Sequence, residues 1–373
     1  MAIKEQEKDN LDSKEISKKK NKKRMLSRKK VRRWIARGVL ALLSLSFIFI
    51  SLYRIPANLT YRVRESFSIS SMDLTEINLI VLLPSTGSYQ MLTEPEVVWP
   101  GSWQSEMFGR VNLIRLAGTI EAGETFTAVI TYDVNLTMGE VSWTGEPVLS
   151  ADLLPQEGIP SDSPDIIAQV ESMKVENDLL ATAMKIYDAV ASQRDPQDSR
   201  DRANVLAALN RAAQIPTRVV TGWVLPDSIP LFGRRIANDT GLQAWNEVFL
   251  QENWQIEDAT CCRPFVEQPL LGWTDGRHLV LDDVGDLESV TQFLAEEDGQ
   301  VSWQSNLLSS PPYIVSAQDG SETLEVIPGL TVTKTWDGRW AMAIAVVVIL
   351  IVLEWMMETD HFTKRSKRKV SVD

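Results

Sequence analysis

Two long apolar runs stand out in the hydrophobic pattern of the chain. The first extends from Gly38 to Tyr53 and the second from Trp340 to Leu353. Each is slightly shorter than the roughly 20 residues that an α-helix needs to cross a bilayer. Flanking arginines and interfacial aromatic side chains can make up the difference. The pattern therefore predicts two transmembrane helices, over 34–55 and 339–357, with a pair of buried core helices as the alternative.

Between these runs, segment 60–150 shows the pattern of β-strands. It carries period-two alternation or short apolar runs that are bounded by turn residues. Four strands are expected, at 61–69, 77–84, 111–120 and 125–134. Because no helical period interrupts them, the pattern predicts a β-sandwich-like domain over 56–154. The Pro-containing stretch at 155–165 is interpreted as a linker.

After the linker the hydrophobic period becomes helical. Apolar residues recur at i, i+3 and i+4 over 166–172 and 175–192. A third helix is expected over 198–213, where Asp198 or Ser199 can cap the first turn. The pattern thus predicts three consecutive helices.

Short β-rich segments follow these helices. Strands are expected at 217–225, 242–250, 253–260 and 277–281. Helices followed by antiparallel strands form an α+β unit, which we expect over 166–283. Segment 284–338 is interpreted as a strand-rich extension that leads to the second apolar run.

Charge separates the ends of the chain from its middle. The net charge is −12, but residues 1–38 hold 15 Lys and Arg against 5 Asp and Glu, and residues 358–373 hold 5 against 3. The remainder, 39–357, contains 18 basic and 42 acidic residues. Because basic residues mark the cytoplasmic side of a membrane segment, both termini are predicted to be cytoplasmic and residues 56–338 extracytoplasmic, which places the protein in the cell membrane.

The basic N-terminus is predicted to contact the membrane surface. Residues 1–33 are rich in Lys and Glu and poor in aromatic residues, which is typical of disorder. The polybasic part is expected to lie on anionic lipid. No aromatic residue is interleaved with the charges of 18–33, so nucleic-acid binding is not expected.

For the first apolar run, a cleaved signal peptide is the alternative to a transmembrane helix, but no small-x-small cleavage site follows Tyr53. Residues 358–373 form a basic cytoplasmic tail.

The chain has two cysteines, Cys261 and Cys262, which are adjacent. An ordinary disulfide needs Cα atoms about 4.4–6.8 Å apart, whereas neighbouring Cα atoms are about 3.8 Å apart. Free thiols or intermolecular pairing are therefore expected, and the spacing excludes a CxxC metal site. The acidic residues Asp282, Asp283 and Asp286 are interpreted as a solvated turn rather than a calcium site. No metal and no cofactor are predicted.

Three segments together resemble the transglutaminase-like (papain-like cysteine) core. They are ALNRAAQIPTRVVTGW from Ala208 to Trp223, AWNEVFL from Ala244 to Leu250, and NWQIEDAT from Asn253 to Thr260. They are similar to the family's helix and following strand, its His-Ala-Trp strand and its strand ending in Asp-Pro-Thr. The order and the spacing also fit. The resemblance covers about a quarter of the chain, roughly 181–281, and implies the fold of that family.

The resemblance also implies three positions for catalytic residues. The family uses a cysteine at a helix N-terminus, a histidine on the next strand, and an aspartate on the following strand that orients the histidine. In this chain these positions are occupied by Ser199, Gln243 and Asp258. Serine is a poor nucleophile without a general base, and glutamine cannot take up and return a proton near pH 7. We therefore expect these positions to be non-functional in catalysis.

The predicted function follows from this loss. We expect a membrane-anchored pseudoenzyme whose former substrate groove binds a peptide, a protein or a cell-envelope component. Trp245 and Trp254 are the candidate binding side chains, although core positions are the more common role of tryptophans. The acidic extracytoplasmic part favours cationic partners.

An active acyl-transfer enzyme is the alternative. It would use Ser199, with Gln243 stabilising an oxyanion, or a relocated group. Cys261 and Cys262 are candidates for a relocated nucleophile. His278 is interpreted as a surface or strand histidine rather than a catalytic base, and the other histidine of the chain is predicted to be cytoplasmic.

Overall fold

The computed structural model describes residues 38, 41–46, 56–84, 86–87, 89–108, 111–144, 147–192, 198–225, 242–259, 270–283, 303–306, 311–317, 324–341 and 344–352. The chain divides into two compact units. One comprises Met1–Ile55 and Arg339–Asp373, and the other comprises Pro56–Gly338.

In the first unit the described residues are helical, at 38, 41–46, 339–341 and 344–352. No helix within the described residues is both long and apolar enough to cross a membrane. The two membrane spans remain predictions from the sequence. The predicted cytoplasmic segments, 1–33 and 358–373, lie outside the described residues.

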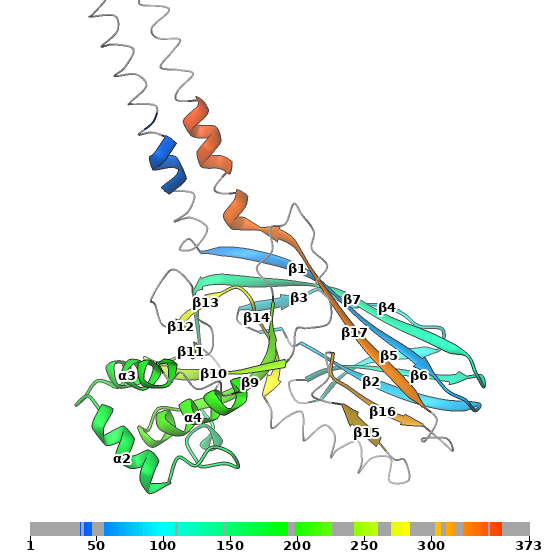
Figure 1. The fold of residues 1–373 in the computed structure, drawn as a ribbon, viewed down its shortest axis with the longest axis horizontal. Helices are drawn as coiled ribbons and strands as arrows, with labels where there is room; N and C mark the ends of the chain where they lie inside the picture. The colour runs from blue at the N-terminus through cyan, green and yellow to red at the C-terminus, as the bar shows by residue number, and fades with distance from the viewer. Residues whose placement is uncertain are drawn as a thin grey trace, which may run out of the picture. The chain divides into compact units, whose positions relative to one another are not determined.

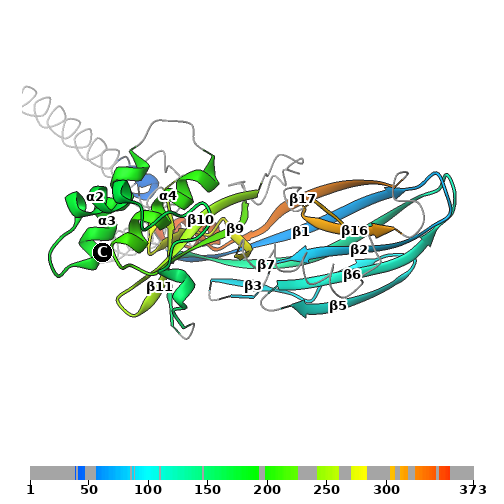
Figure 2. The same ribbon diagram turned by 90° about the horizontal axis from the view of Figure 1, so that it is seen from below.

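Two antiparallel sheets make up one part of the Pro56–Gly338 unit (Figures 1 and 2). The first sheet has the order β13-β7-β1-β17, and β3 and β4 also pair with β7. The second sheet has the order β15-β16-β2-β6-β5. The strands of the first sheet are β1 (Ala57–Ser70), β3 (Gln90–Leu92), β4 (Glu96–Val98), β7 (Thr125–Glu140), β13 (Trp273–Asp275) and β17 (Glu325–Asp337). Those of the second are β2 (Thr75–Leu83), β5 (Ser102–Phe108), β6 (Val111–Ile120), β15 (Trp303–Asn306) and β16 (Tyr313–Ala317).

Side chains that alternate along these strands form a core shared by the two sheets. In β1, for example, Leu59, Tyr61 and Val63 are buried, because every second residue of a strand points to the same face. Apolar residues of β2, β6, β7, β16 and β17 join the same cluster. The four strands predicted between 61 and 134 correspond to β1, β2, β6 and β7, and only the second extends past its strand, by one residue.

The strands after residue 300 belong to this two-sheet structure. β17 runs antiparallel to β1 from Leu59↔Asp337 to Ser70↔Glu325, and β16 pairs with β2. Segment 284–338, which the sequence suggested as a separate extension, thus supplies strands to both sheets. The pairing partners are distant in sequence, so local patterns could not identify them.

A buried carboxyl group lies inside this core. Glu65 of β1 is fully buried, and its Oε1 accepts a hydrogen bond of 2.6 Å from the Tyr132 hydroxyl of β7. Burial raises the pKa of Glu65 to about 8, although the bond from Tyr132 opposes this shift. Glu65 is therefore mainly protonated at neutral pH.

The other part of the unit is a third antiparallel sheet with three helices. The sheet has the order β12-β11-β10-β9-β14, and β8 also pairs with β11. Its strands are β8 (Ser142–Trp143), β9 (Thr217–Val224), β10 (Leu242–Leu250), β11 (Asn253–Asp258), β12 (Leu270–Leu271) and β14 (His278–Asp283). The helices are α2 (Pro164–Met173), α3 (Leu179–Ala191) and α4 (Ser199–Ala212), and a 3₁₀ turn, η1 (Ser150–Asp152), precedes them. The combination of helices and antiparallel sheets agrees with the predicted α+β class.

Small side chains bring α4 close to the third sheet. Ala203, Ala207 and Ala208 of α4 pack with Val219 of β9 and Ala244 of β10 in one buried cluster. Because alanine adds only a methyl group, the helix backbone can approach the strands closely. This packing fixes the N-terminal turn of α4 beside β10.

Candidate active site

The hydroxyl of Ser199 lies against β10. Ser199 is the first residue of α4, and its Oγ accepts a hydrogen bond of 3.2 Å from the backbone N–H of Ala244. The same hydroxyl donates to the Asp198 carboxylate at 3.3 Å. One turn later in α4, the Ala203 carbonyl accepts a hydrogen bond from the Asn246 side chain. These bonds join the start of α4 to β10.

Gln243 precedes Ala244 on β10, so the structure brings the first two predicted positions to neighbouring places. The Gln243 side chain is exposed. In the pairing of β10 with β9, residue 243 lies opposite Gly222. A side-chain amide neither takes up nor releases a proton as a base or an acid near neutral pH. The residue at position 243, where the family has its histidine, therefore cannot act as a general base for Ser199.

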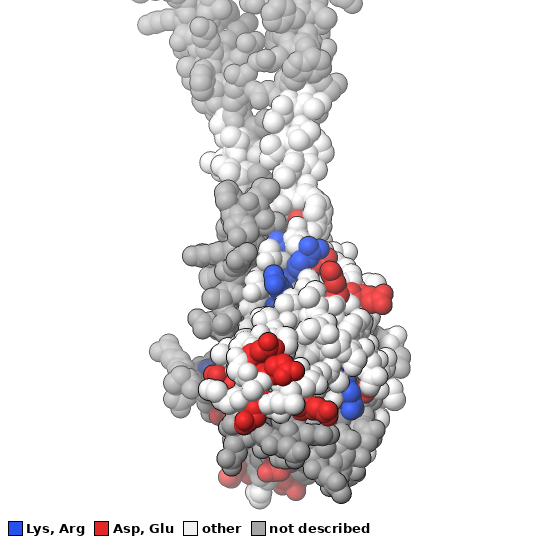
Figure 3. Space-filling model, turned by 90° about the vertical axis from the view of Figure 1, so that its right-hand side faces the viewer, with Lys and Arg blue, Asp and Glu red and all other residues white. Residues whose placement is uncertain are grey.

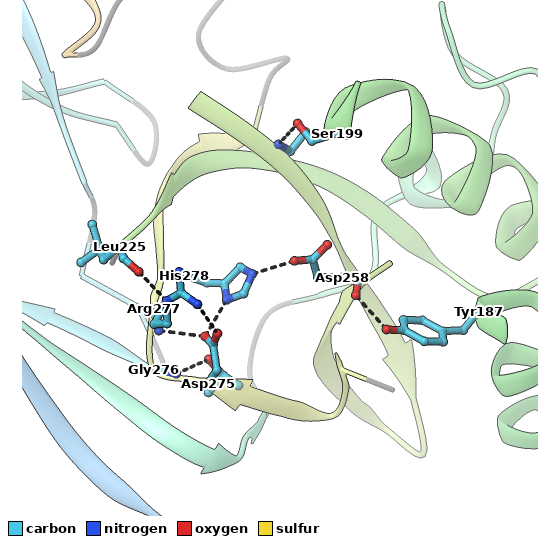
Figure 4. Close-up of polar contacts among 10 residues, drawn as sticks. Tyr187, Ser199, Leu225, Asp258, Asp275, Gly276, Arg277 and His278 are labelled. Atoms are coloured by element: carbon cyan, nitrogen blue, oxygen red, sulfur yellow. Dashed lines mark hydrogen bonds and ion pairs between the residues drawn. The ribbon is translucent and has the colours of Figure 1, made fainter. Parts of the chain in front are cut away.

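Asp258, at the end of β11, is bonded to a residue that is not Gln243. Its Oδ2 lies 2.9 Å from Nε2 of His278, and its backbone carbonyl accepts a hydrogen bond of 2.9 Å from the Tyr187 hydroxyl of α3 (Figure 4). Asp258 and His278 are each 1% exposed. The aspartate thus pairs with a histidine of β14, whereas the family resemblance implied a partner on the neighbouring strand.

His278 lies between two carboxylates. Its other ring nitrogen, Nδ1, is 3.1 Å from Oδ1 of Asp275, three residues earlier in the chain. The backbone N–H of Arg277 also donates to Asp275 Oδ1, at 3.0 Å. Figure 4 shows the imidazole ring between Asp258 and Asp275, apart from Ser199. The sequence predicts a surface or strand histidine at this position. His278 lies on a strand, β14, but it is buried rather than at the surface, because the turn from Asp275 to His278 directs the ring inward.

The two carboxylates keep the imidazole charged. Burial alone would lower the pKa of His278, but the charge of Asp275 and the hydrogen bonds to both carboxylates outweigh burial and raise the pKa to about 9. For Asp275, burial alone would raise the pKa. The charge of His278 and its hydrogen bond outweigh burial and hold the pKa of Asp275 well below its usual value. An imidazolium donates from both nitrogens and has no lone pair left. In this state His278 cannot act as a general base.

Trp245 covers the edge of the imidazole. The two ring centroids are 4.8 Å apart and the planes are at 80°, an edge-to-face arrangement. The contact spans from β10 to β14 across β9, and residue 222 of β9 is a glycine. A Cβ atom added at Gly222 would collide with the Leu279 carbonyl oxygen and lie 2.7 Å from Trp245 Cη2. The missing side chain at 222 therefore leaves room for Trp245 to reach His278.

Replacing Gly222 with alanine is expected to destabilise the Pro56–Gly338 unit by about 1–3 kcal/mol, the usual cost of an overpacked core. The added methyl group must displace β14 or the Trp245 ring. Denaturant unfolding followed by tryptophan fluorescence would measure the loss. A Gly222→Ala variant as stable as the wild type would contradict the packing described.

Trp254 belongs to a second buried cluster. The Arg218 guanidinium lies 4.4 Å from the centre of the Trp254 ring, and its Nε donates to Glu247 at 2.6 Å. The Tyr89 hydroxyl donates to the other carboxylate oxygen of Glu247 at 3.0 Å. Trp245 and Trp254 are 1% and 0% exposed. Both rings are buried in the core, which is the more common role of tryptophans. Their binding role stays a prediction.

A second buried carboxyl group lies beside Asp258. Glu257 is fully buried, and its Oε2 accepts a hydrogen bond of 2.7 Å from Asn210 of α4. Burial raises the pKa of Glu257 to about 8, and the bond from Asn210 opposes the shift. Glu257 is thus mainly protonated at neutral pH.

Within the part of the chain that the structure describes, no cluster of three or more His, Cys, Asp or Glu side chains is arranged to hold a metal ion. Asp282 and Asp283 lie on β14, where they pair with Thr221 and Val220. Cys261 and Cys262, together with Asp286, lie outside the described residues. Their predicted roles therefore stay predictions.

Comparison with known proteins identifies the family of the segment that contains α3, α4 and strands β9 to β11. Residues 170–259 match the family model described as the transglutaminase-like superfamily. The chain contains a transglutaminase-like domain. The predicted resemblance is confirmed, and the match includes Ser199, Gln243 and Asp258. The match ends at residue 259. His278, which is bonded to Asp258, therefore lies outside it.

Two solved structures are similar to the chain that contains this transglutaminase-like domain. One is a proposed cysteine protease from Cytophaga hutchinsonii, with 14% identity and a TM-score of 0.42, and the alignment covers 75% of this chain and 100% of that one. The other is the periplasmic domain of TgpA from Pseudomonas aeruginosa bound to ethylmercury, with 15% identity and a TM-score of 0.27, covering 58% of this chain and 94% of that one. No curated protein matches the sequence significantly.

Proposed function

We propose that the chain is a membrane-anchored, extracytoplasmic pseudoenzyme whose transglutaminase-like domain does not catalyse acyl transfer and instead serves to bind a peptide, a protein or a cell-envelope component. One observation carries the proposal. The aspartate at the triad position is bonded to a buried imidazolium, 2.9 Å away, that also contacts Asp275. Acyl transfer needs a group that takes a proton from the nucleophile and returns it. Gln243 offers no such group, and His278 has both nitrogens engaged.

The charge of the outward part favours a cationic partner. Acidic residues outnumber basic ones 42 to 18 between residues 39 and 357, and carboxylates predominate over Lys and Arg on the face drawn in Figure 3. Such a surface attracts positive ligands over about one Debye length, and salt screens the attraction. The basic N-terminal segment is proposed to lie on anionic lipid on the opposite side of the membrane.

An amide-hydrolysis and glutamine–lysine cross-linking assay on the purified full chain tests the absence of catalysis. The proposal predicts the same rate for the wild type and for Ser199→Ala. Activity that Ser199→Ala abolishes would instead support a serine acyl-transfer enzyme. That alternative draws on the position of the hydroxyl at the start of α4, bonded to the Ala244 N–H. Activity that depends on Cys261 or Cys262 would indicate a relocated nucleophile.

Binding of the full chain to immobilised oligolysine and oligoglutamate tests the proposed partner class. Retention on oligolysine that weakens with added salt would support a cationic partner. Equal retention on both peptides would contradict it.

A further inference from the structure

The second sheet ends in an edge strand that carries no proline and no lysine. Within the described residues, β5 pairs only with β6, and Figure 2 shows it at the margin of the sheet. An edge strand leaves every second backbone N–H and C=O group open to another strand, and natural proteins guard such edges with proline or lysine. β17, at the edge of the first sheet, carries Pro328 and the buried Lys334. β5, with the sequence SWQSEMF, has no Pro, Lys or Arg.

The apolar inner face of the sheet continues onto β5. Trp103 pairs with Leu116 of β6 and Ser105 with Ile114, and paired residues point to the same face of a sheet. Leu116 and Ile114 are buried in the core. Trp103 and Met107, on the same face of β5, are 44% and 73% exposed. The face that forms the core thus extends beyond the region that is covered.

We infer that β5 is a dimerisation strand, which pairs antiparallel with β5 of a second copy about a two-fold axis at Ser105. The strand's own sequence supplies the complement. In this register Trp103 lies opposite Met107 of the second copy, and each such pair occurs twice because the axis is two-fold. Thioether sulfur and an aromatic ring make a favourable contact. The pairing joins two five-stranded sheets into one, and it covers the apolar residues that β5 exposes.

The polar residues of β5 are compatible with this occupant. Glu106 of one copy lies opposite Gln104 of the other, so like charges are not opposed. Within one strand the Gln104 amide donates to the Glu106 carboxylate. Glu106 also forms an ion pair of 3.3 Å with Arg115 of β6. A second copy carries the same β5 sequence, so Trp103 meets Met107 and Gln104 meets Glu106 without any further requirement. An unrelated extended segment would need its own residues that fit those of β5. The inference is independent of the proposed function.

Cysteine cross-linking of the full chain tests the register. In a background with Cys261→Ser and Cys262→Ser, Ser105→Cys places two thiols opposite each other across the axis. Ser102→Cys, on the same exposed strand, places them six residues apart along it, about 20 Å. Mild oxidation should shift Ser105→Cys, but not Ser102→Cys, to a disulfide-linked dimer. Equal cross-linking of the two variants, or none of either, would overturn the register.

Sedimentation of the variants without cysteine substitution tests the dimer itself. Met107→Lys is expected to shift the full chain from dimer to monomer, because it removes the contact between Met107 and Trp103 and because a lysine on an edge strand opposes pairing with another strand. Met91→Lys, at a position that is 63% exposed on β3, should leave the dimer intact. A wild-type chain that sediments as a monomer over the whole concentration range would overturn the inference, as would dissociation by both variants.

Discussion

Replacing His278 with alanine is expected to lower the free energy of unfolding of the Pro56–Gly338 unit by about 3–5 kcal/mol, the usual loss when one partner of a buried ion pair is removed. The imidazolium is 1% exposed and lies 2.9 Å from Asp258 and 3.1 Å from Asp275. Without it, two carboxylates face each other in the interior with no cation between them. The empty space beside Trp245 adds a cavity cost.

Gln243→Ala is the matched control for this variant. Gln243 lies on β10 of the same sheet, but its side chain is exposed. The free energy of unfolding of this variant should therefore stay within about 0.5 kcal/mol of the wild-type value. Denaturant unfolding measures both. A double-mutant cycle with Asp258→Asn should show strong coupling, because Asp258→Asn costs much less once His278 is absent. Additive effects of the two substitutions would mean that the 2.9 Å contact contributes nothing specific.

Stability is expected to fall as the pH rises from 5 to 9. Glu65 and Glu257 have folded pKa values of about 8, above their ordinary 4.5, and His278 has one of about 9, above 6.5. A raised folded pKa means that the folded state holds the proton longer than the unfolded state. The stabilisation is fully present below the unfolded pKa and is lost as the pH passes the folded pKa. The loss thus runs from about pH 4.5 to 8 for each glutamate and from about pH 6.5 to 9 for His278.

The size of the pH effect is several kcal/mol. The shift from 4.5 to about 8 is about 3.5 pKa units, and one pKa unit corresponds to about 1.4 kcal/mol, so complete ionisation of one such buried glutamate costs roughly 5 kcal/mol. Asp275 acts in the opposite direction, but only in acid, since its lowered pKa stabilises the fold above its ordinary value of 3.8. Urea unfolding at pH 5, 7 and 9 measures the trend.

Glu65→Gln identifies one source of the trend. The amide is neutral at every pH and keeps an oxygen to accept the Tyr132 hydrogen bond, so the variant should lose part of the slope between pH 5 and 8. Glu76→Gln, on the exposed side of β2, should keep the whole slope. A wild-type stability that rises from pH 5 to 9 would contradict the buried, protonated state of Glu65.

The sequence predicts the elements of the fold better than their connections. Alternation in Thr125–Glu140 and the helical period in Ser199–Ala212 are local patterns, so the corresponding elements are found where we expect them. The pairing of β17 with β1 joins residues more than 250 positions apart, and no local pattern reveals it. β5 escapes prediction for another reason. Three polar residues separate Trp103 from the apolar pair Met107 and Phe108, and the strand lies at an exposed edge.

The candidate site follows the same division. The family motifs locate Ser199, Gln243 and Asp258 from the sequence, because their spacing along one helix and two strands is regular. The role of His278 depends on a contact between β14 and β11, which are separated by two other strands in the sheet. The signal that could have suggested it is the Asp-Gly-Arg-His turn, with Gly276 at φ +71°. This turn places Asp275 and His278 on the same side, but it does not reveal Asp258.

The loss of catalysis proposed for the transglutaminase-like domain depends on the charge state of His278, and nitrogen-detected NMR of the full chain with labelled histidine measures this state directly. The chain has only two histidines, so a His361→Gln variant assigns the spectrum. The account predicts that His278 shows two protonated ring nitrogens at pH 7 and loses a proton only near pH 9. A neutral ring at pH 7, with one unprotonated nitrogen, would contradict the ion pairs with Asp258 and Asp275 and would restore a possible general base.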